Sequence, residues 1–339
     1  MPSFRTGTVT SIISERDGLQ RVEVDGRNAY VLTSLTGDVA VGDRVVVNTT
    51  AVELGLGTGG WDVVHWNLAR ETWHAGGGGH VMKLRYTSLQ TDTGVAEQRD
   101  GYDERGLDGM PVVACGLHSQ IAPVAAAFKH AAPDATLVFV MTDAAALPLP
   151  LSDLVADLRD RRLLDSTVSA GQAFGGDREA VNLPSALRVA RAAAGADAVV
   201  VGPGPGGVGT ATELGFGALE VAAVVDAAQR DGGQAIVALR WSDADTRPRH
   251  RGLSHHSRTA LRWAGERVTV AVPRGAPALD LGEQDIVEVD VPDVVELLAD
   301  AGIAVTTMGR SPAEEPEFFR YAGAAGVAAA ARVARGTMR

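Results

Sequence analysis

The sequence is poor in cysteine, lysine and aromatic residues. Its single cysteine, Cys115, excludes an internal disulfide, and such sparse use of cysteine is typical of proteins from reducing compartments. Lys83 and Lys129 are the only lysines among the 31 Lys and Arg residues. Because this bias accompanies high Ala and Gly contents, it indicates GC-rich coding, and an isolated arginine therefore says little about function. Aromatic residues make up 5% and hydrophobic residues 45% of the 339 residues, so we expect a core of Ala, Val and Leu.

The chain also lacks a basic excess and a long apolar run. Its formal net charge of -11 disfavours general nucleic-acid binding, which needs a basic surface. Its most apolar window, residues 135–151, is interrupted by Asp143 and two prolines, so we predict no membrane span. Residues 1–10 lack a charged segment followed by an apolar run, so we expect no signal peptide. Together these features predict a cytoplasmic protein.

Residues 4–50 are rich in short β-type segments. β-branched or alternating segments are separated by tight turns, of which Asp25-Gly26 is a typical hairpin turn. We predict a small OB-like or SH3-like β-barrel over residues 1–78, ending in the glycine run that precedes His80. Because acidic side chains are frequent in this part, a structural or docking role is favoured over nucleic-acid binding. His74 and His80 flank the glycine run, and a flexible linker is favoured over a metal-binding pair.

From residue 79 onward, strand-like and helix-like segments alternate. We predict strands at 81–87, 111–115, 136–141, 166–169, 198–201, 234–239, 267–272 and 303–307. We predict helices at 118–131, 152–160, 178–194, 216–230, 293–301 and 311–335, and a further helix within 256–264. This alternation is typical of a Rossmann-like α/β domain, with a mostly parallel sheet and helices on both faces. Ligands of such domains bind beyond the carboxyl ends of the strands, so we searched those loops for a site.

The loop after the strand at 198–201 is rich in glycine. Its glycines and the threonine that follows them are Gly202, Gly204, Gly206, Gly207, Gly209 and Thr210. Glycine lets the backbone approach a ligand closely, and the unused N–H groups can bind an anion. Pro203 and Pro205 remove two of these donors, and no Lys-Ser/Thr pair ends the loop, so it is not a Walker A loop. An anion-binding loop and a rigid turn at the sheet edge are both compatible with this pattern.

Polar side chains follow several of the other predicted strands. As catalytic residues we predict His118, Ser119, Asp143, His255 and His256, and as ligand-binding residues, besides the glycine loop, Asp177 and Arg251. They are compatible with a Ser/His/Asp set or with a His/Asp metal site. Adjacent histidines at a helix start point in different directions, so we expect one of them to act as acid, base or single ligand. Arg251 belongs to a basic island, residues 247–258, which could bind phosphate or carboxylate or form a solvated loop.

Several motifs together resemble those of a known family. They are Met82-Lys-Leu-Arg-Tyr-Thr87, Asp108-Gly-Met-Pro-Val-Val113, Gly116-Leu-His-Ser119, Val140-Met-Thr-Asp143, Ala173-Phe-Gly-Gly-Asp177 and Arg251-Gly-Leu-Ser-His-His-Ser257. Over nearly its whole length, the β-rich start included, the chain resembles the bacterial domain-of-unknown-function family DUF3866. This resemblance implies membership of a family but no particular reaction.

Two functions follow from these observations. The first is an enzyme that binds a small anionic metabolite or nucleotide at the carboxyl edge of the sheet, with hydrolase or transferase chemistry. In it His255 or His256 would be the acid/base, Arg251 and the glycine loop would hold the anion, and Asp143 would orient a group or bind a metal. The alternative is a non-catalytic ligand-sensing or assembly protein with the barrel as its docking module. The expected partner is a small anionic ligand, and neither membrane nor nucleic acid is expected. A homo-oligomer, a cofactor and a bound metal are left open.

Overall fold

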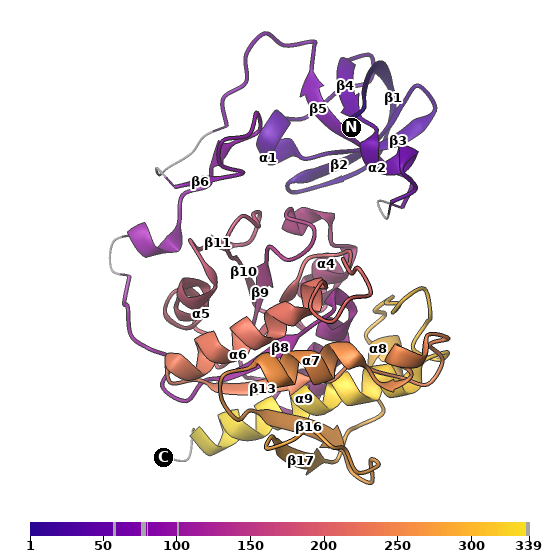
Figure 1. Cartoon of the computed structure of the whole chain (residues 1–339). Coiled ribbons are helices and arrows are strands. Elements are labelled where there is room, and N and C mark those ends of the chain that lie inside the picture. Colours follow the sequence, from indigo (N-terminus) through magenta and orange to yellow (C-terminus); the bar gives the residue numbers. More distant parts are fainter. Residues whose placement is uncertain (57–58, 76–78, 80, 100–101, 337–339) are drawn as a thin grey trace. The chain divides into compact units, whose positions relative to one another are not determined.

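The computed structural model describes the chain except for residues 57–58, 76–78, 80, 100–101 and 337–339 (Figure 1). The chain forms two compact units, Met1–Gly94 and Val95–Arg339. The boundary predicted from the sequence falls between residues 78 and 79, whereas the segment 79–94 belongs to the first unit here. That segment holds the two-stranded sheet of β6 (Met82–Lys83) and β7 (Thr91–Asp92). The longer strand predicted at 81–87 is wrong, because Leu84 and Tyr86 have φ angles of 51° and 61°, which no strand accommodates.

The first unit contains a closed five-stranded barrel, which confirms the predicted small barrel. Its strands are β1 (Phe4–Arg16), β2 (Leu19–Val24), β3 (Arg27–Val31), β4 (Arg44–Asn48) and β5 (Asp62–Asn67), with the short helices α1 (Thr33–Thr36) and α2 (Thr50–Glu53). The strands pair in the order β1-β2-β3-β5-β4, and β4 closes the barrel on β1. Alternate valines, such as Val22 with Val24 and Val45 with Val47, fill its core. The sequence did not predict β5, because polar side chains interrupt its apolar alternation.

The second unit is built on an eight-stranded sheet whose strands are all parallel, which confirms the predicted Rossmann-like α/β fold. The strand order is β11-β10-β9-β12-β8-β13-β16-β17. The strands are β8 (Pro111–Cys115), β9 (Leu137–Thr142), β10 (Ser166–Ser169), β11 (Arg178–Glu179), β12 (Ala198–Pro203), β13 (Gln234–Ala238), β16 (Thr269–Pro273) and β17 (Asp285–Val289). A small antiparallel pair, β14 (Trp241–Ser242) and β15 (Gly252–Leu253), follows β13.

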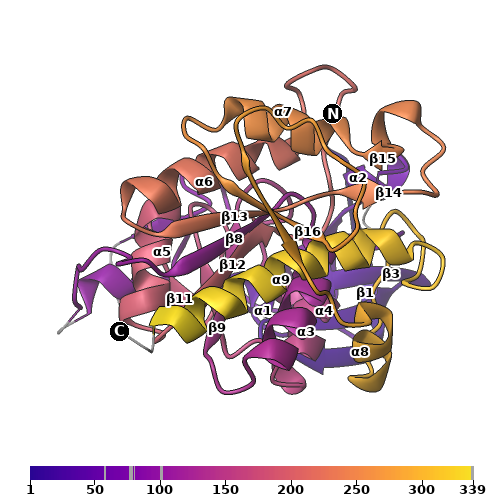
Figure 2. The ribbon, with the colours of Figure 1, turned by 90° about the horizontal axis from the view of Figure 1, so that it is seen from below.

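Helices cover both faces of this sheet (Figure 2). One face packs against α3 (Ile121–Ala131), α4 (Asp153–Asp160), α8 (Val294–Asp300) and α9 (Pro316–Gly336). The other face packs against α5 (Leu183–Ala192), α6 (Glu220–Arg230) and α7 (His255–Trp263). Short 3₁₀ turns are η1 (Ala96–Gln98), η2 (His118–Gln120), η3 (Leu149–Leu151), η4 (Gly217–Leu219) and η5 (Pro248–His250). Within the described residues, no helix is both long and apolar enough to cross a membrane.

The carboxyl-terminal part differs from the prediction. The strand predicted at 303–307 does not form, and only an isolated bridge joins Thr307 to Arg310. The edge position of the sheet is taken by β17, a strand that was not predicted from the sequence. The last helix begins at Pro316 rather than at Ser311, because a turn over residues 312–314 precedes it. These differences place residues 304–308 in an irregular segment, which contributes to the site described next.

Candidate functional site

The carboxyl ends of β8 and β12 form a topological switch point. The two strands are adjacent and parallel, but β8 leads to α3 on one face of the sheet and β12 leads to α6 on the other. Connections that diverge in this way leave a crevice, which is where open α/β sheets bind ligands. A cavity of about 520 Å³ lies here. Its lining comes from the loops after β8, β9, β12 and β13 and from residues 304–308.

The glycine loop after β12 forms one wall of this cavity. Gly206, Gly207 and Gly209 line it together with Pro203 and Pro205. Gly206 has a φ of 91°, a left-handed conformation that favours glycine. The N–H groups of Gly206 and Gly207 form no hydrogen bond with any described residue. The wall therefore offers backbone donors to a ligand, as an anion-binding loop does.

His118 connects two walls of the cavity. Its Nδ1 lies 2.9 Å from the carbonyl oxygen of Pro203, and its Nε2 lies 2.7 Å from Oγ of Ser152. Because a carbonyl only accepts, Nδ1 carries the proton, and Nε2 accepts from the hydroxyl of Ser152. Burial lowers the pKa of His118 to about 4, although its bond to Pro203 opposes this shift, so the ring is neutral at pH 7. Ser152 also caps α4 by accepting from Val155 N at 3.0 Å.

The opposite wall is cationic. Arg240, Arg247 and Arg249 line the cavity, and no Asp or Glu is among its described lining residues. Asp245 accepts from Arg247 at 2.9 and 2.7 Å, and its closest approach to Arg240 is 3.5 Å. Arg249 is exposed and has no carboxylate partner among the described residues. Burial, followed by the nearby Arg247, lowers the pKa of Arg240 to about 10, which leaves this side chain charged at neutral pH.

Two buried carboxylates hold the arginine-bearing loop in place. Asp245 accepts from the backbone N–H of Arg247 at 3.0 Å, and its bond to the Arg247 side chain keeps the pKa of this carboxyl far below its usual range. Glu315, which precedes α9, accepts from the hydroxyl of Ser242 at 2.8 Å and from Asp243 N at 2.8 Å. Arg310 binds the same carboxylate at 2.7 Å. The loop is thereby tied to the segment before α9, and its cationic side chains have a fixed location.

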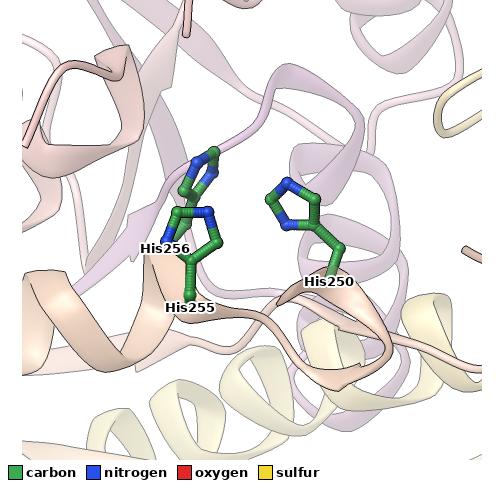
Figure 3. A group of neighbouring side chains, drawn as sticks. All are labelled: His250, His255 and His256. Atoms are coloured by element: carbon green, nitrogen blue, oxygen red, sulfur yellow. The ribbon is translucent and has the colours of Figure 1, made fainter. Parts of the chain in front are cut away.

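Three histidines gather beside these arginines (Figure 3). His255 and His256 form the start of α7, and His250 faces them from η5. Their ring centroids are 4.3 to 4.9 Å apart, and one side-chain nitrogen of each lies within 4.8 Å of the others. The expectation that His255 and His256 point in different directions is therefore wrong. Phe216 stacks on the ring of His256, with ring centroids 3.9 Å apart.

Burial and the arginines keep these imidazoles neutral. The pKa of His250 is lowered to about 4 and that of His256 to about 3, in both cases by burial first and by Arg240 second. The pKa of His255 is lowered as well, by burial and then by Arg249. Neutral imidazole nitrogens carry lone pairs at pH 7, so they can accept a hydrogen bond or bind a metal ion.

One family model matches the sequence of the chain. The model is described as Protein of unknown function (DUF3866), and it matches residues 28–326. The chain belongs to this family. The match includes every residue that lines the cavity and confirms the resemblance found in the motifs. No curated protein and no solved structure matches the chain significantly.

Several residues predicted for the site lie elsewhere in this DUF3866 chain. Asp143 is exposed and accepts from Gln172 N at 2.9 Å, outside the cavity lining. Asp177 immediately precedes β11, so it lies at the amino end of that strand, where Arg159 and the N–H of Thr167 hold it. We expected the loop that follows β10 to remain at the carboxyl edge of the sheet, but it returns to the amino end before β11 begins. Asp177 is consequently remote from the other predicted residues.

The remaining predicted residues are divided between the cavity and its surroundings. Ser119 lines the cavity, as do His118 and His256, whereas His255 lies behind them. Gly202, Gly204 and Thr210 are outside the lining. Arg251 is also outside, because it follows the 3₁₀ turn η5 and begins an extended segment. Of the proposed linker pair His74 and His80, His80 lies outside the described residues.

The structure also shows residues at or near the site that were not predicted from the sequence. His250 and Arg240 line the cavity. The sequence indicated His250 only by placing it close to the pair His255 and His256. Outside the cavity lining, Glu220 at the start of α6 accepts from the hydroxyl of Thr142 at 2.5 Å. Burial raises the pKa of Glu220 to about 7, the bond to Thr142 opposes the shift, and Asp143 adds to it.

Proposed function

We propose that the α/β unit binds a small phosphorylated metabolite or nucleotide in the cavity at the switch point between β8 and β12. The observation that carries this proposal is the charge of the lining: three arginines, and no described carboxylate. A buried guanidinium with weak pairing is costly, and an anionic ligand would offset that cost. Arg240 is 6% exposed, and its only carboxylate partner among the described residues lies 3.5 Å away.

The geometry of the donors favours phosphate over other anions. Phosphate accepts hydrogen bonds in several directions, and guanidinium groups bind it through two parallel bonds. The lining combines these arginines with a second set of donors, the N–H groups of Gly206 and Gly207, which form no hydrogen bond with any described residue. The volume of about 520 Å³ suits a metabolite or a mononucleotide.

The contacts do not support a Ser/His/Asp mechanism at this site. Ser119 has no hydrogen-bond partner among the described residues, and both ring nitrogens of His118 bind elsewhere. Asp143 is engaged by Gln172. We therefore assign hydrolase or transferase chemistry, if the chain performs it, to the histidines beside the arginines. A cytoplasmic location is part of the proposal, because phosphorylated metabolites are intracellular and a single cysteine suits a reducing compartment.

The test is a thermal-shift screen with inorganic phosphate, pyrophosphate and nucleotides, followed by a matched pair of variants. A ligand at a hundred times its Kd stabilises the protein by about 2.7 kcal/mol. Arg249→Met and Arg251→Met each remove one positive charge from an exposed side chain, two residues apart, but only Arg249 lines the cavity. We expect Arg249→Met to weaken phosphate binding by about tenfold or more, because a bond to a charged group contributes about 1.5–3 kcal/mol. Arg251→Met should retain the affinity of the wild type.

Two results would overturn the proposal. If both variants weakened binding equally, phosphate would be responding to net charge rather than to a site. If no phosphate compound stabilised the wild-type protein, the cavity would not be a phosphate site. In that case a ligand-sensing or assembly role with a different ligand class would replace it.

A further inference from the structure

The histidine cluster formed by His250, His255 and His256 has a polar atom without a partner. Nε2 of His255 is buried and forms no hydrogen bond with any described residue. A buried polar group that lacks a partner costs about 1–3 kcal/mol, so such atoms in folded proteins usually face a ligand or water. The other two imidazoles stand close to it, with ring centroids of His255 4.9 Å from His250 and 4.3 Å from His256.

A hydrogen bond to one ring nitrogen orients His250, as is usual for metal-binding histidines. Its Nδ1 lies 2.8 Å from Oγ of Ser254, which is fully buried and also accepts from His256 N at 3.2 Å. A partner on one ring nitrogen fixes the ring and directs the other nitrogen towards the ligand. One residue, Ser254, thus caps α7, orients His250 and positions the pair of histidines that follows. No carboxylate is part of the cluster.

We infer that His250, His255 and His256 bind a borderline divalent metal ion of the Zn²⁺ type, with an open coordination position towards the cavity. Imidazole suits Zn²⁺ and its transition-metal neighbours, whereas Mg²⁺ and Ca²⁺ require oxygen ligands. Three protein ligands with an open position are the arrangement of catalytic zinc sites. Zn–N bonds of about 2.0–2.1 Å place ligand nitrogens roughly 3.4 Å apart. The nitrogens, now within 4.8 Å of one another, would approach by up to about 1.4 Å on binding.

The neighbouring arginines disfavour a metal ion that has no anionic ligand. Arg240 Nη1 lies 3.3 Å from Nδ1 of His256, and Arg249 Nε lies 3.4 Å from Nε2 of His250. Positive charge so close opposes a bare divalent cation. A phosphate that bound both the ion and Arg249 would remove this repulsion, and this step rests on the proposed function. A metal ion there would polarise a phosphoryl oxygen or activate a water molecule, which is the chemistry that a phosphate hydrolase or transferase requires.

The test is titration of the metal-free full-length protein with Zn²⁺ by calorimetry and with Co²⁺ by visible absorption. We expect one equivalent of Co²⁺ to give the intense bands of a four-coordinate site. His255→Gln and His250→Gln should each weaken binding by at least about tenfold. His130→Gln is the matched control, because His130 is exposed at the end of α3 and outside the cluster. Inorganic phosphate should tighten Zn²⁺ binding, and Zn²⁺ should tighten phosphate binding by the same factor.

The outcomes separate the two proposals. In one outcome, phosphate binds with the expected dependence on Arg249, but the wild type binds Zn²⁺ and Co²⁺ no more tightly than His255→Gln and His250→Gln do. The metal site would then be refuted and the phosphate site retained. If Zn²⁺ bound in a manner that required His255 and His250 while phosphate did not bind, the metal site would stand and the proposed function would fall. Loss of binding in His130→Gln as well would place the ion outside the cluster and overturn the inference. Thermal unfolding of each variant shows whether it is folded.

Discussion

At the scale of single residues, Arg240 and Glu220 show how burial affects opposite charges around one site. Burial lowers the pKa of Arg240 to about 10, but the guanidinium remains charged at pH 7. Burial raises the pKa of Glu220 to about 7, so about half of these carboxyls hold a proton at neutral pH. A group with such a pKa exchanges protons readily near pH 7, which is a common property of functional sites. Glu220 is also the residue for which the fold makes the clearest pH prediction.

We predict that Glu220 makes the protein less stable as the pH rises from 4.5 to about 7. Between these values the folded state keeps the proton while the unfolded state has lost it, so raising the pH favours unfolding. The stabilisation is complete below pH 4.5 and is lost through pH 7. The shift from 4.5 to about 7 corresponds to at most about 3 kcal/mol. The measurement is the free energy of unfolding of the wild type relative to Glu220→Gln, at pH 5 and at pH 8.

Thr142→Val is the companion variant, because the hydroxyl of Thr142 lowers the pKa of Glu220. Its removal should move the loss of stability to higher pH. A difference between wild type and Glu220→Gln that did not change with pH would show that Glu220 is ionised in the folded protein throughout this range.

At the scale of elements, the glycine loop combines two roles in one short segment. A Cβ on Gly204 would lie 2.2 Å from the carbonyl oxygen of Ala146, so this glycine lets the loop pack against the loop after β9. A Cβ on Gly207 would have no atom within 4 Å, and the φ of this residue is not positive. The first glycine serves packing, and the second leaves space in the cavity wall.

We predict opposite effects of alanine at these two positions. Gly204→Ala should destabilise the α/β unit by about 1–3 kcal/mol, because the backbone of Ala146 must move. Gly207→Ala should stabilise it by about 0.4–1 kcal/mol, because it restricts only the unfolded chain. Denaturant unfolding, followed by the fluorescence of Trp241 and Trp263, measures both. Equal destabilisation by the two changes would contradict the division of roles within the loop.

The same elements show what a sequence can and cannot predict. Strands β8 and β10 were predicted to the residue, because β8 is a short apolar run and β10 has the β-branched residues Thr167 and Val168 at its centre. The direction of a loop is not local information, and Asp177 was therefore assigned to the wrong edge of the sheet. β17 was missed although it contains the β-branched residues Ile286, Val287 and Val289, two of which are exposed at the edge of the sheet. His250 was missed because its neighbours in the cluster are brought together by the turn η5 and the start of α7, not by a motif.

At the scale of the whole molecule, the apolar cores divide in the same way as the chain. The barrel core consists of residues between Val9 and Val64, whereas both cores of the α/β unit consist of residues from Ala96 onward. No buried cluster contains residues of both units among the described residues. Units with separate cores can unfold separately, since cooperativity depends on shared packing. The proposed ligand contacts the second unit alone.

We therefore predict two calorimetric transitions that respond to different changes. Val47→Ala, in the barrel core, and Val201→Ala, in β12, each remove two buried methyl groups at a cost of about 2 kcal/mol. Val47→Ala should lower the Tm of one transition by about 10 °C, and Val201→Ala the other by about 5 °C, since the larger unit has the larger unfolding entropy. Saturating inorganic phosphate should raise the Tm of only one transition, the one whose Tm Val201→Ala lowers. A single transition that both variants and phosphate shifted together would show that the two units unfold as one, and the separation of their cores would then not govern stability.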